Sequence, residues 1–413
     1  MKFTALGLSI LCFACNLDDN SDGTGGVKGP PGGRCPAGTT VVLSDFQSTQ
    51  IALSDLEGRT LSESFISTAS AQTSGVAFAL SGDVGLPSTR PASGNVVLLD
   101  RYGTNVITWV ATETAEVLGQ LPVGTGFESN PRDYLEVDAT RAFLTRWGQN
   151  AAPGKEPFDR GGDLLVIDTQ ERRILSALEF PMEDGLPPRA SSISRVGNEY
   201  VVTLERISDD FATTGDSILA AVSPEADEIV WQQRIEGKKN CGRVEASPSG
   251  KRFVLACSGE IDEDGEAKDL GGSGILVFER APNGLKELDR YEPQELQSQL
   301  VQSEVAFIDD DRLLYKTQTG YGGSGNNRLA VLDFESRQSQ VLIEARPDDE
   351  GKGKGLTYVG LFCAPGCAQT CLIADSDRGV LQTVHADATS VALGEPIKVE
   401  DKVGLPPVQI GPR

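Results

Sequence analysis

The chain has 413 residues, and its 60 acidic side chains against 37 basic ones give a formal net charge of −23. Because nucleic-acid binding needs a basic surface, this balance excludes a nucleic-acid partner. The only histidine, His385, rules out histidine-rich metal sites and is the one base available to a serine–histidine–aspartate mechanism.

The chain begins with an export signal. One lysine precedes an apolar stretch over residues 3–14, which is too short to span a bilayer. A small residue then precedes Cys15, and a polar Gly/Pro-rich stretch follows at once. This junction resembles the signal of bacterial lipoproteins, although Cys12 stands where that family usually has leucine. The resemblance implies a signal peptide over residues 1–14, lipidation of Cys15 and a tether over residues 15–38.

The compartment follows from the same resemblance. We expect the chain in the cell envelope, held to the membrane by its lipid alone, and at the outer membrane rather than the inner one. The alternative is an ordinary cleaved signal in which Cys15 is incidental.

Residues 39–413 carry one pattern seven times. An alternating apolar strand, a short polar turn and a second strand recur at intervals of about 55 residues. The first strands of these hairpins end at Asp55, Ala111, Asp168, Ser223, Glu279, Asp333 and His385. A second hairpin lies between successive units, so each repeat holds four strands, here named A to D in chain order. Because one such sheet can bury its faces only against neighbours, seven repeats predict an all-β, seven-bladed β-propeller.

The ends of this region complete the ring. Residues 39–46 read as strand B of blade 1, with no strand A before them, and the tail over residues 403–413 holds one short strand around Val408–Ile410. We expect the N- and C-terminal strands to pair and close the ring. The prediction is one monomeric propeller domain over residues 39–413.

An even number of cysteines in an exported chain predicts disulfides. Those outside the signal are Cys35, Cys241, Cys257, Cys363, Cys367 and Cys371. Cys241 and Cys257 lie symmetrically about a turn near Ser249, which predicts a bridge across hairpin A–B of blade 5. We expect Cys35, just before blade 1, to bond one of the three cysteines of blade 7, and the other two to pair. Three connectivities remain open. The rival interpretation of the blade 7 trio is a metal site, but the trio lacks the usual C-x2-C spacing.

Residues 105–124, 163–175 and 246–257 resemble the repeat of lactonase-like, or surface-layer-type, seven-bladed propellers. The resemblance covers roughly residues 39–413 and implies the fold. Such propellers include scaffolds, binding proteins and hydrolases that work from a metal or a His/Glu/Arg set near the central channel, so the resemblance does not choose an activity. No motif of that catalytic set is present here to carry across.

Loop length varies on one face of the predicted ring, where the B–C and D–A connections lie. Blades 3 to 6 have long B–C connections, over residues 148–162, 207–217, 259–273 and 318–327. Because function is commonly grafted onto a repeat framework through such loops, we expect a ligand-binding face there. Its candidate residues are Trp147, Asp209, Asp210 and Tyr321. The alternative is neutral variation in exposed loops.

The blade 5 connection is dense in carboxylates. Glu260, Asp262, Asp264, Glu266 and Asp269 surround a glycine, and such oxygens can wrap a calcium ion. The closing glutamate of an EF-hand is missing, and the rival interpretation is a solvated acidic loop. The sequence requires no other cofactor.

The leading functional prediction is a non-enzymatic binding or scaffold protein of the cell envelope, with an envelope protein or a glycan as its partner. One alternative is an exported hydrolase of the lactonase or esterase kind that uses a carboxylate-held metal. A second is a calcium-stabilised adhesin. We expect His385 to be an ordinary strand-end residue rather than a catalytic base.

Overall fold

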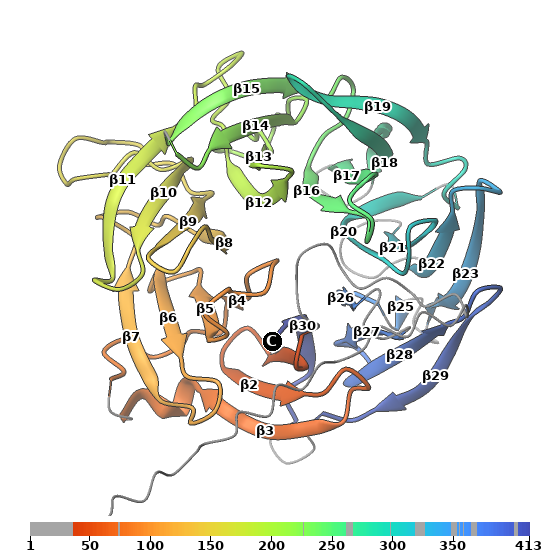
Figure 1. Cartoon of the computed structure of the whole chain (residues 1–413), viewed down its shortest axis with the longest axis horizontal. Helices are drawn as coiled ribbons and strands as arrows, with labels where there is room; N and C mark the ends of the chain where they lie inside the picture. The colour runs from red at the N-terminus through yellow and green to blue at the C-terminus, as the bar shows by residue number, and fades with distance from the viewer. Residues whose placement is uncertain are drawn as a thin grey trace, which may run out of the picture.

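The described chain forms a ring of seven blades around a central axis (Figure 1). The computed structural model describes residues 36–413 except 73–74, 226, 262–266, 298, 319–326, 348–352, 355, 358, 365–369 and 400–403. Each blade is a four-stranded antiparallel sheet, which confirms the all-β, seven-bladed propeller. In this described part, no helix is long and apolar enough to cross a membrane.

The strands of blades 1 to 4 run from the axis outward as follows. Blade 1 holds β30 (Pro407–Pro412), β1 (Thr39–Ser44), β2 (Thr49–Ser54) and β3 (Thr60–Ser67). Blade 2 holds β4 (Val84–Gly85), β5 (Val96–Asp100), β6 (Val106–Val110) and β7 (Val117–Pro122). Blade 3 holds β8 (Pro131–Glu136), β9 (Arg141–Arg146), β10 (Asp163–Asp168) and β11 (Arg173–Glu179). Blade 4 holds β12 (Ala190–Val196), β13 (Glu199–Leu204), β14 (Ile218–Ser223) and β15 (Glu228–Arg234).

The remaining blades follow the same order. Blade 5 holds β16 (Cys241–Ala246), β17 (Phe253–Ile261), β18 (Ala267–Ala281) and β19 (Gly284–Tyr291). Blade 6 holds β20 (Leu300–Phe307), β21 (Arg312–Gln318), β22 (Arg328–Asp333) and β23 (Gln338–Glu344). Blade 7 holds β26 (Val359–Cys363), β27 (Thr370–Asp375), β28 (Val380–Ala386) and β29 (Val391–Ile397). A 3-10 turn, η1 (Thr68–Gln72), and a two-stranded ribbon, β24 (Arg346–Pro347) with β25 (Gly353–Lys354), lie in connections between blades.

The chain ends close the ring as expected. Strand β30 pairs antiparallel with β1 and supplies the inner strand that blade 1 otherwise lacks. The N–H of Ala37 donates to the carbonyl of Arg413 at 3.0 Å, and the N–H of Arg413 donates to the carbonyl of Gly38 at 2.9 Å. These bonds close the ring within blade 1, where the C-terminal strand meets the N-terminal one.

The core lies between adjacent blades. The middle strands are buried on both faces, as in β10, while the outer strands alternate between half-buried and exposed residues, as in β11. Phe143 of blade 3 packs edge-to-face on Tyr200 of blade 4, with ring centroids 5.4 Å apart. Trp109 packs against blade 3 and Trp231 against blade 5, so both tryptophans serve inter-blade packing. A single blade could not bury these side chains alone.

Two disulfides are present in the described residues. Cys241 lies directly opposite Cys257 in the β16–β17 register, and the two are bonded, which confirms the bridge across that hairpin. Cys363 is bonded to Cys371 across β26 and β27, so the metal interpretation of the blade 7 trio fails because two of its thiols are consumed. Cys35 and Cys367 lie outside the described residues. The expected bridge from Cys35 therefore has Cys367 as its remaining partner.

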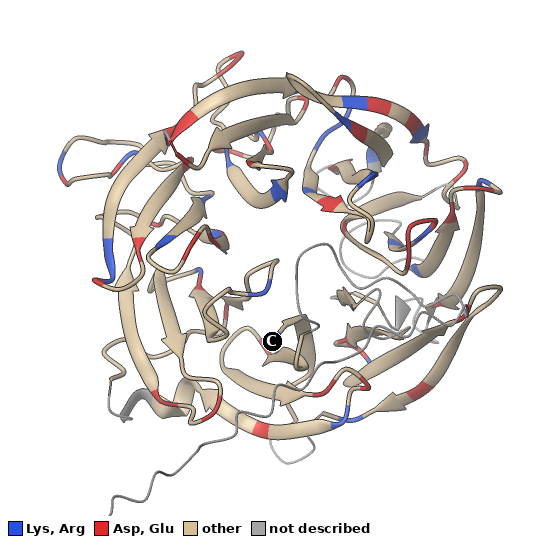
Figure 2. Cartoon of the chain, in the orientation of Figure 1, with Lys and Arg blue, Asp and Glu red and all other residues tan. Residues whose placement is uncertain are grey.

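The blade 5 connection differs from the expected loop. Strand β17 continues to Ile261 and β18 begins at Ala267, so much of residues 259–273 is an extended hairpin, with Glu260 opposite Asp269. The physical reason is that β17 and β18 continue their backbone pairing beyond the blade. The segment was not expected to form strands because its many charged residues interrupt the alternation of apolar and polar residues. Figure 2 shows that charged residues also occur on the inner strands around the axis.

Candidate functional site

The face that carries the B–C and D–A connections is held by buried cations at the base of its loops. Arg146 ends β9 and is 0% exposed. Its guanidinium donates to both carboxylate oxygens of Asp163, at 2.7 and 2.6 Å, on the far side of the blade 3 loop. It also donates to the carbonyls of Val123 and Phe158 and to the hydroxyl of Thr125. One side chain thus ties the 148–162 loop to the D–A connection before blade 3.

The same arrangement recurs in blades 4 and 5. Arg206, at the start of the blade 4 connection, donates to the carbonyl of Asp216 at 3.0 Å and to the carboxylate of Asp184 at 2.8 Å. Lys238, 1% exposed, donates to the carbonyl of Ser273 at 2.6 Å and to the carboxylate of Glu292 at 2.7 Å. Because a buried cation needs every available acceptor, these bonds restrain the loop backbones.

The blade 3 loop is also ordered from within. The carboxylate of Asp159 accepts the backbone N–H groups of Glu156, Gly154 and Lys155 at 2.8 to 3.0 Å. These donors stabilise the ionised form and lower the pKa of Asp159. These internal hydrogen bonds therefore give the loop a defined conformation.

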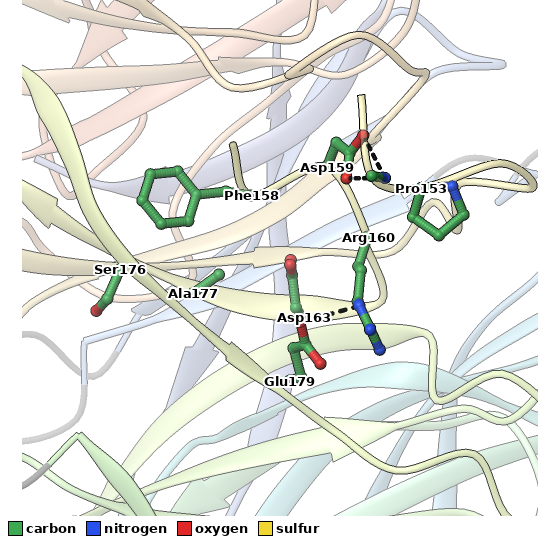
Figure 3. Close-up of a pocket in the computed structure, with 9 residues that line it drawn as sticks. Pro153, Phe158, Asp159, Arg160, Asp163, Ser176, Ala177 and Glu179 are labelled. Carbon is green, nitrogen blue, oxygen red and sulfur yellow. Dashed lines mark hydrogen bonds and ion pairs between the residues drawn. The ribbon is translucent and has the colours of Figure 1, made fainter. Parts of the chain in front are cut away.

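A cavity of about 350 Å3 lies between this loop and the outer strand β11 (Figure 3). Its walls include Pro153, Phe158 and Ala177, with the exposed pair of Arg160 and Glu179 at 3.2 Å. An apolar wall beside a charged pair suits a ligand that has an apolar part next to a charged group.

Trp147 lies beneath the blade 4 loop. Its ring is stacked on that of Phe211, with centroids 5.8 Å apart, and the guanidinium of Arg189 lies 4.2 Å from the ring centroid. Its indole N–H donates to the carboxylate of Glu205 at 2.6 Å. Trp147 is 8% exposed, so most of its surface contacts protein and Phe211 presents the outer aromatic face. Ligand contact by Trp147 stays a prediction.

The other predicted loop residues differ in their hydrogen-bond partners and in whether the structure describes them. Asp209 accepts a hydrogen bond from Arg189 at 2.6 Å, and its side chain is 75% exposed. Asp210 accepts the hydroxyl of Ser208 at 2.6 Å, which lowers its pKa. Tyr321 lies outside the described residues. The structure thus brings Trp147 and Asp209 together through Arg189, and their role in binding stays a prediction.

Three of the five calcium candidates, Asp262, Asp264 and Glu266, lie outside the described residues. Glu260 accepts the ammonium groups of Lys239 and Lys268, both at 2.6 Å. The part of the chain that the structure describes holds no cluster of three His, Cys, Asp or Glu side chains placed to bind a metal ion. Asp269 accepts the N–H of Gly271 at 2.8 Å. Calcium binding stays a prediction that now depends on residues 262–266.

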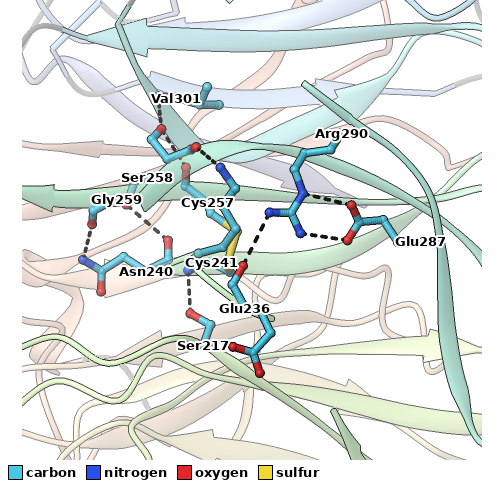
Figure 4. Close-up of a disulfide and its surroundings, with 12 residues drawn as sticks. Ser217, Glu236, Asn240, Cys241, Cys257, Ser258, Gly259, Glu287, Arg290 and Val301 are labelled. Atoms are coloured by element: carbon cyan, nitrogen blue, oxygen red, sulfur yellow. Dashed lines mark hydrogen bonds and ion pairs between the residues drawn. A yellow bond between two sulfur atoms is a disulfide. The ribbon is translucent and has the colours of Figure 1, made fainter. Parts of the chain in front are cut away.

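The disulfide of blade 5 stands beside this hairpin (Figure 4). The N–H of Cys241 donates to the hydroxyl of Ser217 at 3.1 Å, and the side chain of Asn240 donates to the carbonyl of Gly259 at 2.6 Å. The disulfide joins β16 to β17, and the two hydrogen bonds hold the start of β16 to the blade 4 and blade 5 connections.

The central channel is a second candidate site, with a cavity of about 220 Å3 lined by all seven blades. Ser88 lies within it, held from two sides. Its N–H and hydroxyl donate to the carboxylate of Asp133 at 2.9 and 2.7 Å, and its carbonyl accepts the guanidinium of Arg243 at 2.8 Å. Asp133 also accepts the N–H groups of Tyr134 and Ile193. These bonds tie blades 2, 3, 4 and 5 together across the channel.

Glu304 on β20 is a channel carboxyl group with a raised pKa. Burial raises its pKa to about 7, and Arg243 opposes that rise by attracting the carboxylate. Burial likewise raises the pKa of Asp133. Glu304 is thus divided between its neutral and ionised forms near neutral pH, which suits a group that exchanges protons.

This channel set was not predicted from the sequence. Arg132, Asp133, Arg243 and Glu304 lie on three inner strands far apart in the chain. The signal available was a charged residue one or two positions before the apolar alternation of three strands A, which begins at Tyr134, Val244 and Val305.

Comparison with known proteins identifies the fold alone. No protein-family profile and no curated protein matches the chain. A putative 6-phosphogluconolactonase from Bacteroides fragilis shares 14% identity, with a TM-score of 0.56 over 91% of this chain and 97% of that one. The periplasmic gluconolactonase of Pseudomonas aeruginosa shares 13%, with 0.53 over 87% and 95%. A hypothetical selenium-binding protein from Sulfolobus tokodaii shares 10%, with 0.55 over 92% and 94%. The chain is similar to lactonase-like seven-bladed propellers in fold.

Proposed function

We propose that the chain is a non-enzymatic binding or scaffold protein of the cell envelope, lipid-anchored through Cys15, that holds an envelope protein or glycan on the long B–C connections of blades 3 to 6. The observation that carries the proposal is the set of buried cations, Arg146, Arg206 and Lys238, at the base of these connections. Binding orders whatever was mobile, so a surface already held in place loses less entropy when a partner docks. The cavity beside the blade 3 loop supports the same proposal.

The test replaces the 148–162 and 207–217 connections with two-residue turns in the full chain. Expected results are the loss of crosslinked partners on intact cells and an unchanged melting temperature within a few degrees. A matched control shortens the turn over residues 169–172, on the opposite face. If the crosslinked partners and the envelope phenotype are the same in all three chains, the proposal is wrong.

A second candidate function is hydrolysis of a lactone or ester in the central channel. It is favoured by the pKa of Glu304, about 7, and by the positive charge of Arg243, which lines the same cavity and attracts the Glu304 carboxylate. Ionised Glu304 would take a proton from an attacking water, Arg243 would stabilise the oxyanion, and the proton would pass to the leaving alkoxide. The described channel residues offer no carboxylate cluster for the metal expected of such an enzyme.

Gluconolactone and p-nitrophenyl acetate are suitable probes for this candidate. The hydrolase predicts turnover that falls at least a hundredfold in Glu304→Gln and in Arg243→Met. Turnover that is absent from the native chain, or equal in the variants, rejects it. Metal analysis of the purified chain with and without chelator tests the metal separately.

A further inference from the structure

The exposed aromatic side chains gather on one face of the ring. In the described residues they are Phe46, Phe78, Tyr102, Phe158 and Phe211. All but Phe78 lie in B–C connections, one each in blades 1, 2, 3 and 4. We call Phe46, Tyr102, Phe158 and Phe211 the aromatic arc. The exposed leucines and valines lie instead on outer strands, at Leu61, Leu175, Val230, Leu288, Val341 and Leu393.

Three members of the arc have a backbone conformation that phenylalanine rarely adopts. The φ angles of Phe46, Phe158 and Phe211 are 63°, 59° and 61°. This left-handed region suits glycine, and a bulky residue there is an outlier. Burial does not explain these side chains, since they are 49%, 38% and 65% exposed. A strained and exposed aromatic side chain at a loop tip points to a contact role.

The backbone beside these rings is held in place. The carbonyl of Phe158 accepts both Arg146, at 2.6 Å, and the hydroxyl of Thr125, at 2.9 Å. The N–H of Phe46 donates to the hydroxyl of Ser44 at 2.9 Å. The ring of Phe211 is stacked on Trp147. Rigid aromatic side chains give contact area at a low entropic cost.

The B–C connections of blades 1 and 4, which carry Phe46 and Phe211, have a net negative charge, while that of blade 3 is balanced and that of blade 2 holds Arg101 alone. Acidic residues outnumber basic ones in the B–C and D–A connections of blades 1 to 4. Asp45 precedes Phe46 and Asp210 precedes Phe211, and both carboxylates are exposed. Backbone N–H groups of Ser48 and Gln47 lower the pKa of Asp45, so it is ionised at neutral pH. Carboxylates beside aromatic faces attract ammonium and guanidinium groups twice, by charge and by cation–π contact.

We propose that the aromatic arc is the contact surface for a protein partner that presents lysine and arginine side chains. This inference rests on the proposed binding function and extends its surface to blades 1 and 2, whose B–C connections are short. An anionic membrane surface would be repelled by the same carboxylates, and hot spots of protein interfaces are rich in aromatic residues.

The test selects a random 12-residue peptide library on the full chain and measures the affinity of the selected peptides. The expected peptides are rich in lysine and arginine, and their affinity falls when salt is raised from 50 to 300 mM. A chain with serine at all four arc positions should bind them at least tenfold more weakly. A matched control with serine at Leu61, Leu175, Leu288 and Leu393 should bind them as the native chain does.

Each other outcome overturns the inference. Selected peptides without basic residues, or affinities within twofold in the arc variant, contradict it. Binding of the native chain to phosphatidylglycerol vesicles or to a glycan array, lost in the arc variant, assigns the arc to another partner class. If peptide binding survives the arc variant but is lost with the blade 3 and blade 4 connections, the inference fails while the proposed function stands.

Single variants separate binding from folding. Phe46→Gly and Phe158→Gly relieve the left-handed backbone, so they should keep or raise the melting temperature while weakening peptide binding. A lower melting temperature together with unchanged binding would show that these rings serve the fold alone, which contradicts the proposal.

Discussion

Replacing Asp163 with asparagine should loosen the 148–162 loop and destabilise the whole propeller. Asp163 and Arg146 both have fully buried side chains, and two hydrogen bonds of 2.7 and 2.6 Å join them. The variant keeps the shape of the side chain but removes its charge, and the guanidinium stays buried without a counter-ion. Breaking such a pair from one side costs about 3–5 kcal/mol. Because Arg146 keeps acceptors at Val123, Thr125 and Phe158, we expect a loss of about 3 kcal/mol.

Urea unfolding followed by circular dichroism measures this loss, and hydrogen exchange measures the loop. Amides over residues 148–162 should exchange faster in Asp163→Asn, and their increase should exceed that of the amides in blades 5 to 7, whose slowest members follow global stability. The matched control is Glu179→Gln, which breaks the exposed pair with Arg160 at the same loop. An exposed pair contributes only about 0.2–1 kcal/mol, so the control should be near native. A loss below about 1 kcal/mol in Asp163→Asn, or unchanged exchange in the loop, would refute the anchoring role of the pair.

Three further predictions follow from other parts of the chain. Glu304 holds its proton more tightly when folded, with a pKa of about 7, than when unfolded, so the native chain loses stability as pH rises from about 4.5 through 7. The stability of Glu304→Gln relative to the native chain should therefore rise from pH 5 to pH 8 in urea titrations, and a constant difference would contradict this. Replacing both Cys241 and Cys257 with alanine removes a disulfide between residues 16 positions apart in the sequence. The free energy of unfolding should fall by about 3 kcal/mol, because the unfolded chain is then less constrained. An unchanged urea midpoint would count against this prediction. If the blade 5 connection binds calcium, the ion should raise the melting temperature, and Asp262→Ala with Asp264→Ala should abolish the rise; an equal rise in both chains rejects the site.

Part of the candidate site could be predicted because it depends on local pattern. The loop face was predictable because the B–C position of each long connection follows from counting strands. Trp147 was expected to end strand B beside a long loop, and it lies one residue beyond the end of that strand. Its burial was not predictable, because Phe211 and Arg189 come from the neighbouring blade and from the connection that leads into it. The extended blade 5 hairpin was missed because its charges mask the alternation that marks a strand.

The sequence by itself determined the seven blades, the ring closure by the tail and the Cys241–Cys257 bridge. The physical reason is that strand alternation, turn residues and symmetry about a turn act over a few residues. Only the tertiary structure decided which side chains meet across the axis and between blades. Asp133 and Arg243 both bond Ser88, and Arg146 gathers acceptors from both connections at its loop. Such contacts depend on the twist of each sheet and on the closure of the ring, and the residue spacing of a single repeat predicts neither.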